Sequence, residues 1–244
     1  MKKIEDLNIK IFADGADKAS MLEMNQRSYI KGLTTNPTLM RKAGITDYAS
    51  FAKNILQHIK EKPISFEVFS DDFEEMIEQA HLIASWGSNV YVKIPVMNTK
   101  ATPAYDLIHR LASAGIKQNV TALMTLDQVS HTMQALAKGP SAYISVFAGR
   151  VADTGCDPLP LMKHSLELIK AYPQLELIWA SPRELLNIFQ ADAIGCHIIT
   201  VTNDILNKLS IVGKNLDDFS LDTVKMFYKD AQLAGFSLRQ EAMV

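Results

Sequence analysis

Lys93 is the residue best suited to covalent chemistry, because it lies in the middle of the apolar, β-rich run NVYVKIPV at residues 89–96. A lysine ammonium is costly to bury unless it is paired with an opposite charge or becomes neutral. A neutral amine in an apolar strand is the form that attacks a carbonyl carbon and makes a Schiff base. The run also fits an edge strand whose lysine points into water and discourages pairing with other chains. Lys93 alone leaves both interpretations open.

Polar residues that could assist such an amine lie at or near the ends of six other apolar runs. They are Asp14, Asn36, Glu67, Asn119, Thr121, Ser145, Arg150, Ser181 and Arg183. Some have a local alternative: Asp14 and Ser181 could cap helices, and Asn36 could serve a turn. Caps and turns do not readily explain why polar groups end seven successive runs around a lysine, and this favours an active site.

Eight short β-rich runs alternate with helical patterns, and they predict the strands that must position these residues. The predicted strands are Ile9–Ala13, Ile30–Thr34, Ile64–Val68, Val90–Ile94, Gln118–Ala122, Ala142–Phe147, Leu175–Ala180 and His197–Val201. Eight strand–helix units predict an α/β fold with a parallel sheet, and eight strands close a (β/α)₈ TIM barrel, whose active sites lie at the C-terminal ends of the strands. A doubly wound sheet is less favoured, because the first strand ends in Asp14-Gly15 with no GxGxxG turn.

We expect one domain over residues 1–244, since no long linker or low-complexity tract interrupts this rhythm. Beyond the eighth unit, Leu221, Val224, Phe227 and Ala231 form the apolar face of an additional C-terminal helix over about residues 220–235. This helix either covers the barrel or docks on a neighbouring subunit.

Composition and missing motifs argue against several classes of protein. The net charge is −2 and no lysine- or arginine-rich block occurs, so we expect no nucleic-acid partner. No run is long enough to span a bilayer, and the first residues lack the apolar segment of a signal peptide. We therefore expect a cytoplasmic protein with no membrane partner. The six histidines lack metal-ligand spacing, and Walker, GxSxG and CxxC sequences are absent, so we expect no metal.

Two segments resemble the signatures of a known family. The run GLTTNPTL at residues 32–39 resembles the Thr-Thr-Asn-Pro signature of transaldolases and their fructose-6-phosphate aldolase relatives, and VKIPV at residues 92–96 is similar to their Schiff-base strand. The similarity continues through ISVFAGR at 144–150, ASPR at 180–183 and AIGC at 193–196 into the terminal helix. It covers nearly the whole chain, and the length resembles the compact branch of the family.

The resemblance implies a catalytic role for four residues. Lys93 would attack the C2 carbonyl of a ketose and form an iminium, an electron sink that lets the C3–C4 bond break and leaves a bound dihydroxyacetone enamine. Asp14 would take the proton of the C4 hydroxyl and return it when the new bond forms. Glu67 and Thr121, with a trapped water between them, would manage protons while the Schiff base forms and breaks down.

The resemblance also implies the residues that bind substrate. Those that would hold hydroxyls of the dihydroxyacetone unit are Asn36, Asn119 and Ser145. Those that would bind the substrate phosphate through charge-assisted hydrogen bonds are Arg150, Ser181 and Arg183. Such a site needs no metal and no organic cofactor. Similarity to the compact branch implies a homo-oligomer, a ring of five or ten subunits.

Three positions bear on the choice between transferase and aldolase. Glu67, Asn119 and Phe147 look like transaldolase residues, whereas the aldolase branch carries Gln, a non-amide residue and a Tyr whose hydroxyl can help protonate the carbanion. The resemblance therefore favours a transaldolase. A fructose-6-phosphate or dihydroxyacetone aldolase and a non-catalytic sugar-phosphate-binding barrel are the alternatives, and the intact catalytic set counts against the second of these.

Four residues depart from the family's usual pattern near the expected substrate positions. They are Gly15, Met97, Trp179 and Pro182. These departures leave open a specialised enzyme that acts on a sugar phosphate related to those of the pentose phosphate pathway.

Overall fold

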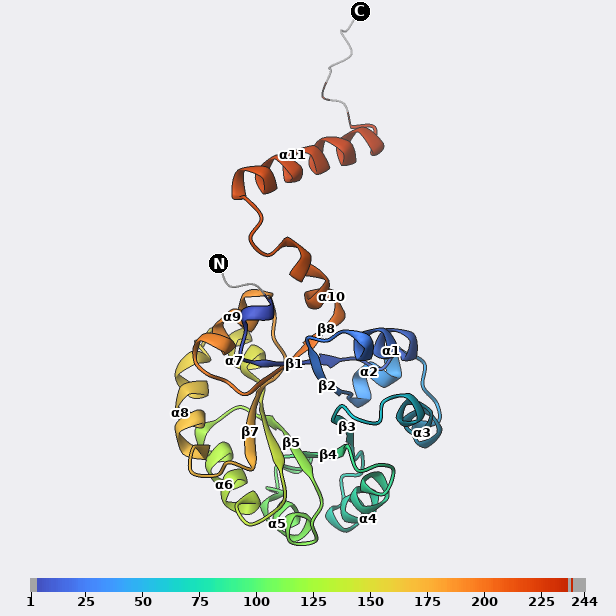
Figure 1. Ribbon diagram of the computed structural model, residues 1–244, viewed down its shortest axis with the longest axis vertical. Coiled ribbons are helices and arrows are strands. Elements are labelled where there is room, and N and C mark those ends of the chain that lie inside the picture. The colour runs from blue at the N-terminus through green and yellow to red at the C-terminus, as the bar shows by residue number, and fades with distance from the viewer. Residues whose placement is uncertain (1–3, 237, 239–244) are drawn as a thin grey trace, which may run out of the picture.

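Eight parallel strands close into one barrel, β1 to β8 in chain order with β8 paired against β1 (Figure 1). The computed structural model describes residues 4–236 and residue 238. The strands are β1 (Lys10–Asp14), β2 (Ile30–Thr34), β3 (Ile64–Glu67), β4 (Val90–Pro95), β5 (Gln118–Leu123), β6 (Ala142–Val146), β7 (Leu175–Trp179) and β8 (Ile198–Thr202). The predicted α/β class and the (β/α)₈ TIM barrel are confirmed, and each predicted strand agrees with the observed one to within two residues at either end.

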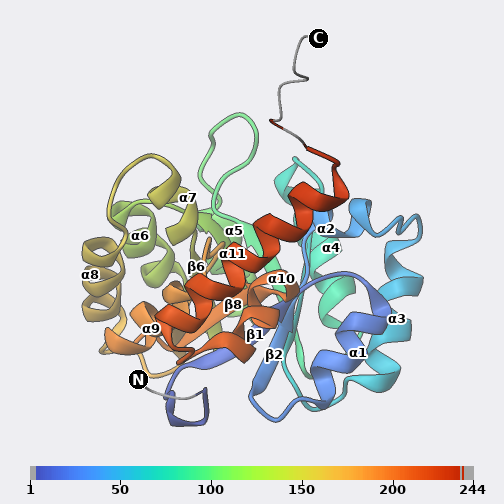
Figure 2. The same cartoon turned by 90° about the horizontal axis from the view of Figure 1, so that it is seen from above.

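Helices form the outer layer of the barrel, as both views of the ribbon show (Figures 1 and 2). They are α1 (Lys18–Gln26), α2 (Pro37–Lys42), α3 (Tyr48–His58), α4 (Phe73–Ala84), α5 (Tyr105–Ser113), α6 (Leu126–Leu136), α7 (Ala148–Asp153), α8 (Leu159–Ile169), α9 (Leu186–Ala193) and α10 (Asn203–Leu206), with α11 (Leu216–Leu233) beyond them and short 3₁₀ turns at Ile4–Asp6 and Asn207–Ile211. Side-chain caps fix where several begin: Asp17, Asp47, Asp72 and Thr125 each accept a main-chain N–H at the start of α1, α3, α4 and α6. Each cap contributes about 1 kcal/mol.

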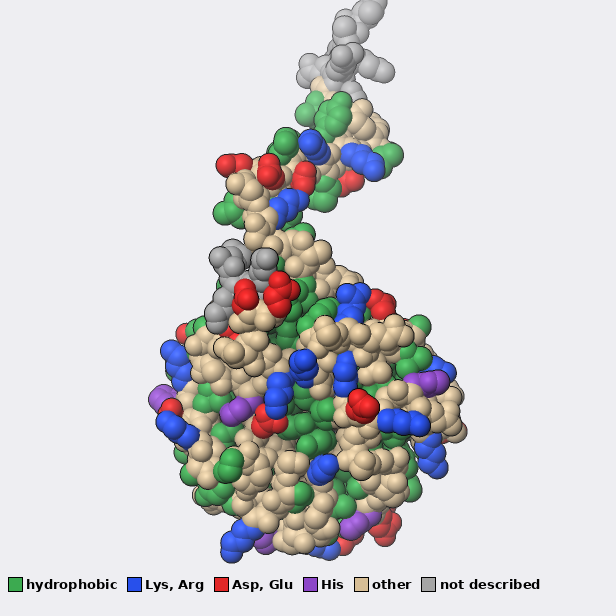
Figure 3. Space-filling model, in the orientation of Figure 1, with side chains coloured by type: hydrophobic (Ala, Val, Ile, Leu, Met, Phe, Trp, Pro, Cys, Tyr) green, Lys and Arg blue, Asp and Glu red, His purple; other side chains and the backbone are tan. Residues whose placement is uncertain are grey.

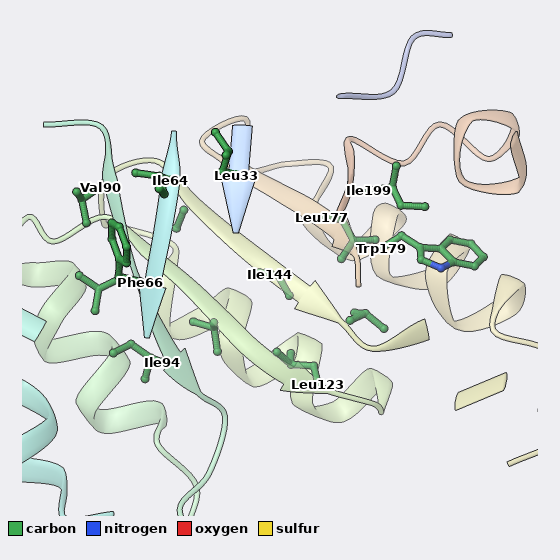
Figure 4. Packing of buried hydrophobic residues seen from close by; sticks show 14 of the residues in the cluster. Leu33, Ile64, Phe66, Val90, Ile94, Leu123, Ile144, Leu177, Trp179 and Ile199 are labelled. Carbon is green, nitrogen blue, oxygen red and sulfur yellow. The ribbon is translucent and has the colours of Figure 1, made fainter. Parts of the chain in front are cut away.

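Outward-facing strand residues pack beneath the helices and form the main core. Side chains alternate along a strand, so Ile64 and Phe66 of β3 and Val90 and Ile94 of β4 all face the helices (Figure 4). Phe66 and Ile94 are fully buried, and burying such a side chain stabilises the fold by about 1.5–3 kcal/mol. This outer core holds each strand rigidly in place around the barrel.

Inward-facing residues build an aromatic floor inside the barrel. Tyr91 stacks on Tyr143 with ring centroids 4.1 Å apart, and Phe12 meets Tyr143 edge to face at 5.7 Å. Gly32 makes room for this floor, because a Cβ on Gly32 would lie 2.5 Å from the Phe12 ring. The next inward residue of each strand is two positions further on. Those residues therefore form a layer above the floor, at the C-terminal end of the barrel.

Helix α11 extends away from the barrel and has no buried residue (Figure 1). It runs over Leu216–Leu233, where we predicted about 220–235, and it begins earlier because the Asn215 side chain caps the N–H groups of Asp217 and Asp218. Of the two predicted placements, covering the barrel is therefore wrong for this chain. The domain that we predicted over residues 1–244 includes 1–3, 237 and 239–244, which lie outside the described residues.

Among the residues that the structure describes, no helix combines the length and the apolar character needed to cross a membrane.

Candidate active site

A cavity of about 580 Å³ opens at the C-terminal end of the strands, directly above the aromatic floor. All the predicted site residues line it: Asp14, Asn36, Glu67, Lys93, Asn119, Thr121, Ser145, Phe147, Arg150, Ser181 and Arg183. They come from the ends of seven strands and the loops that follow. The barrel therefore brings together residues that span 170 positions of the sequence, from Asp14 to Arg183.

Lys93 points into the barrel and is 6% exposed. Its strand β4 pairs with β3 on one side and β5 on the other, so the edge-strand interpretation is wrong. The ammonium Nζ donates a hydrogen bond to the main-chain oxygen of Thr35 at 2.9 Å and lies 3.1 Å from Glu67 Oε2. Glu67 occupies the neighbouring position on β3, in register with Lys93. A carboxylate at this distance can take a proton from the amine and leave it nucleophilic.

Asp14 lies across the barrel at the end of β1, held by hydroxyl and amide groups. Thr34 Oγ1 donates to Asp14 Oδ1 at 2.7 Å, and Asn36 Nδ2 lies 3.5 Å from Oδ2. Thr34 in turn shares a short hydrogen bond with Thr200 of β8. Burial raises the pKa of Asp14, and the charge of Lys93 and the Thr34 hydrogen bond oppose that rise only in part. A raised pKa suits a carboxyl group that must both accept and return a proton.

Thr121 presents an unpartnered hydroxyl to the cavity. Its Oγ1 is buried and has no hydrogen-bond partner. The next residue, Ala122, has a left-handed φ of 66°, and the register of β5 against β6 shifts between Val120 and Leu123. This bulge changes the direction of the strand beside Thr121. A buried polar atom without a partner is costly, so this hydroxyl is suited to a substrate atom or a water.

A buried network fixes the orientation of Asn119. Its Oδ1 accepts a hydrogen bond from Ser145 Oγ at 2.7 Å, and its Nδ2 donates to Ser65 Oγ at 3.0 Å. The contact with Ser65 on β3 passes across β4, and Asn119 pairs in register with Lys93 of β4. The Asn119 amide therefore lies beside Lys93. Because an amide nitrogen has two N–H groups, one remains to donate to a substrate hydroxyl.

Arg150 and Arg183 bring positive charge to one end of the cavity, and Ser181 adds a hydroxyl there. The Arg150 guanidinium lies over the Phe147 ring, 5.7 Å from its centroid. Arg183 donates from Nε to Asp153 Oδ1 at 3.0 Å and from Nη2 to the other oxygen of Asp153, which leaves part of its guanidinium free. This end of the cavity is suited to an anion such as a phosphate.

The loop after β7 is held in a strained conformation by a close approach to α7. Ser181 has a φ of 57°, which is uncommon for a residue with a side chain. Its main-chain oxygen lies where a Cβ on Gly149 would be, at 1.6 Å. Only a glycine at 149 allows the two segments to approach so closely, and this approach sets the positions of Ser181 and Arg183.

Comparison with known proteins agrees with this geometry. Residues 11–244 match the family described as Transaldolase/Fructose-6-phosphate aldolase. The chain belongs to the transaldolase/fructose-6-phosphate aldolase family. It is thus an enzyme of the transaldolase type.

Individual members of the transaldolase family match nearly the full length of the chain. A probable transaldolase of Thermoanaerobacter sp. (strain X514) is 34% identical over 226 residues, which cover 92% of this chain and 99% of the relative. A probable transaldolase of Streptococcus pyogenes serotype M5 (strain Manfredo) is 36% identical over 203 residues, covering 83% and 90%. A solved structure of a dihydrodipicolinate synthase family protein from Coccidioides immitis shares the fold alone, with a TM-score of 0.56 and 12% identity over 78% of this chain and 66% of that one.

A cap or a turn was the alternative role for Asp14, Asn36 and Ser181, and this transaldolase-family barrel decides each case separately. Asp14 caps no helix, because Asp17 is the N-cap of α1. Asn36 is the N-cap of α2, with Oδ1 accepting from the Leu39 N–H, and the same side chain directs its amide towards Asp14. Ser181 occupies a strained loop and starts no helix, since α9 begins only at Leu186.

Of the four departures from the family pattern, only Pro182 lines the cavity. Trp179 is buried and faces outward into the core between β7 and the helices (Figure 4). Met97 packs against the outer core as well, and the Gly15 N–H is held by the Thr34 main-chain oxygen at 3.0 Å. The expectation that all four lie where substrate is gripped is wrong for Trp179, Met97 and Gly15, because their side chains or positions lie outside the cavity.

Sequence reasoning missed several residues that support the site. Thr34 holds Asp14 and Thr200 holds Thr34, and the position of both threonines near the C-terminal ends of predicted strands was a signal for them. Asp153 holds Arg183 from α7, and nothing in the sequence pairs these two residues. No group of three His, Cys, Asp or Glu side chains arranged to hold a metal ion occurs among the described residues.

Proposed function

We propose that this family member is a transaldolase that moves a dihydroxyacetone unit from a ketose phosphate to an aldose phosphate through a Schiff base on Lys93. The observation that carries the proposal is the buried amine of Lys93, 3.1 Å from Glu67 Oε2, in the cavity that Asp14 also lines. A non-catalytic binding barrel has no use for a buried amine with proton-accepting neighbours.

In the proposed reaction, Glu67 takes a proton from the Lys93 ammonium, and the neutral amine adds to the ketose C2 carbonyl. The adduct loses its C2 hydroxyl as water, with Glu67 returning the proton, and an iminium remains. Asp14 then accepts the proton of the C4 hydroxyl. The electron pair of the C3–C4 bond passes to the iminium, which becomes an enamine as the first aldehyde leaves. Addition of the enamine to a second aldehyde and hydrolysis of the new iminium complete the transfer.

Glu67 and Thr121, with a water between them, manage the protons while the Schiff base forms and breaks down, and the other cavity residues serve binding in this proposal. Asn119, held between Ser65 and Ser145, and Asn36, held at the start of α2, offer amide N–H groups to the hydroxyls of the dihydroxyacetone unit. The substrate phosphate binds at the opposite end of the sugar, where Arg150, Ser181 and Arg183 meet. Arginine's planar fork suits a phosphate bound through two parallel hydrogen bonds.

We favour transfer over free cleavage because Phe147 brings no hydroxyl to the cavity that could protonate the enamine. The test is an assay with fructose 6-phosphate, with and without erythrose 4-phosphate as acceptor. Transfer predicts that the ketose is consumed only when the acceptor is present. Dihydroxyacetone released at the same rate without an acceptor would instead support an aldolase.

A lysine pair provides the matched control for this assay. Lys93→Met is expected to lose activity by several orders of magnitude, because Lys93 is the only lysine among the described residues that line the cavity. Lys163 lies exposed on α8, outside the cavity, and Lys163→Met is expected to keep wild-type rates. Full activity of Lys93→Met would overturn the proposal.

We also propose that the enzyme is a homo-oligomer, a ring of five or ten subunits. Apolar side chains of α11, including Leu221, Val224 and Phe227, are more than half exposed, and hydrophobic and charged groups are interspersed along this arm (Figure 3). Covering such an apolar surface with a second copy of the chain is energetically favourable. Light scattering tests this, and a monomer at micromolar concentration would contradict it.

We propose that the enzyme is cytoplasmic. Cys156 and Cys196 are both free thiols, and free thiols are typical of a reducing compartment such as the cytoplasm.

A further inference from the structure

Glu67 is the last residue of β3, at a point where one neighbouring strand has already ended. On one side β3 continues to pair with β4, since the Val68 N–H donates to the Lys93 main-chain oxygen at 3.1 Å. On the other side the pairing stops with the Thr35 N–H donating to the Ser65 oxygen, also at 3.1 Å. Alternate residues of a parallel strand bond to opposite neighbours, so Glu67 directs its N–H and C=O to the same side as Ser65. No strand faces them there.

The phenol of Tyr48 takes the place of the missing strand. The Glu67 N–H donates to Tyr48 Oη at 2.7 Å, and the Tyr48 hydroxyl donates to the Glu67 main-chain oxygen at 2.8 Å. Tyr48 is the first residue of α3, and its ring packs against Phe66, Phe69 and Trp86, with centroids 6.3, 5.5 and 6.0 Å away. Burial raises the pKa of Tyr48, so the hydroxyl keeps the proton that it donates.

We propose that Tyr48 is a positioning residue for the reaction: by holding the main chain of Glu67, it fixes the Glu67 carboxylate against the Lys93 amine. The inference rests on the proposed Schiff-base function. Without the hydroxyl, two partly buried main-chain groups lose their partner, which is unfavourable. The peptide units on either side of Glu67 then rotate to find other partners, and they carry the carboxylate away from its 3.1 Å contact with Lys93 Nζ.

Tyr48→Phe tests the proposal, because it removes the hydroxyl and keeps the ring. A misplacement of about 1 Å can slow a catalytic step about a hundredfold, so kcat is expected to fall about ten- to hundredfold. KM for the ketose phosphate is expected to change less than about threefold, since other strands supply the binding groups. The rate at which borohydride traps the iminium in single turnovers is expected to fall as kcat does.

Two control variants separate positioning from a general loss of stability. Tyr29 pairs its hydroxyl with Arg27 outside the cavity, and Tyr29→Phe is expected to leave kcat unchanged. Ile55 is fully buried on α3, the helix of Tyr48, so Ile55→Val lowers stability but leaves the Tyr48 hydroxyl in place. Its kcat at a temperature well below unfolding is also expected to match wild type.

A double-mutant cycle with Glu67→Gln decides whether Tyr48 acts through Glu67. The proposal predicts that Tyr48→Phe slows the Glu67→Gln enzyme less than threefold, because the carboxylate it positions is already gone. An equal loss in both backgrounds would overturn the proposal, as would a Tyr48→Phe enzyme with wild-type kcat or with a change in KM alone. Wild-type enzyme that traps no iminium at all would instead reject the Schiff-base function itself.

Discussion

Gly149→Ala should damage the anion-binding end of the cavity, because the added Cβ would lie 1.6 Å from the Ser181 main-chain oxygen. An ordinary nonbonded contact needs about 3.5 Å, so one of the two segments must move by more than about 1 Å. Alanine gains about 1 kcal/mol over glycine in a helix, but overpacking costs about 1–3 kcal/mol and often more at so close an approach. The clash therefore wins. We expect a loss of about 1–2 kcal/mol and a Tm lower by about 2–8 °C.

The functional loss in Gly149→Ala should be specific to phosphate. Displacing Ser181 and Arg183 removes at least one charge-assisted hydrogen bond, so KM for fructose 6-phosphate is expected to rise about ten- to hundredfold. KM for fructose, which lacks the phosphate, should change little, and inhibition by inorganic phosphate should weaken in parallel. Gly15→Ala is the size-matched control, because a Cβ there meets nothing within 4 Å. Equal KM values for wild type and Gly149→Ala with fructose 6-phosphate would refute the reasoning.

Two further predictions concern pH. Burial raises the pKa of Asp14, so the ionised carboxylate costs stability once the pH rises through that folded-state pKa. Asp14→Asn is therefore expected to unfold at a higher temperature than wild type at about pH 8, with the difference closing near about pH 4, while kcat falls at least about a hundredfold. Thermal melts across this pH range check the sign, and a lower Tm at about pH 8 would contradict it. Burial lowers the pKa of His197, which Glu176 and Lys10 face and whose Nδ1 accepts the Leu177 N–H at 3.1 Å. The stability that depends on the neutral ring is therefore full above the ordinary pKa of 6.5 and falls as the pH drops below it. His197→Gln keeps an acceptor without a titrating ring and should flatten that loss in melts between about pH 7 and pH 5; an unchanged slope would contradict the assignment.

The barrel and most of its cavity could be predicted because they follow from local patterns. Short β-rich runs between helical patterns predict each strand, and the C-terminal ends of strands in such a barrel face one cavity, so Asp14, Glu67 and Lys93 had to meet there. The resemblance to transaldolases then supplied their roles, which remain predictions.

Contacts that depend on how loops and helices pack could not be predicted. Tyr48 belongs to a helix outside the barrel, and its bond to Glu67 exists only because β2 ends before β3 does. The pairing of Asp153 with Arg183 depends on the position of α7 over the β7 loop. Each of these contacts depends on how a helix packs against a strand or loop, and the spacing of residues in the sequence does not determine that packing.

Trapping of the Schiff base with borohydride tests the central claim most directly. Wild-type enzyme incubated with fructose 6-phosphate and reduced with borohydride should carry one dihydroxyacetone-derived adduct, located by mass spectrometry on the peptide that contains Lys93. Lys93→Met should carry none, and Lys163→Met should be labelled like wild type. An active wild-type enzyme without the adduct, or an adduct that persists in Lys93→Met, would contradict the account.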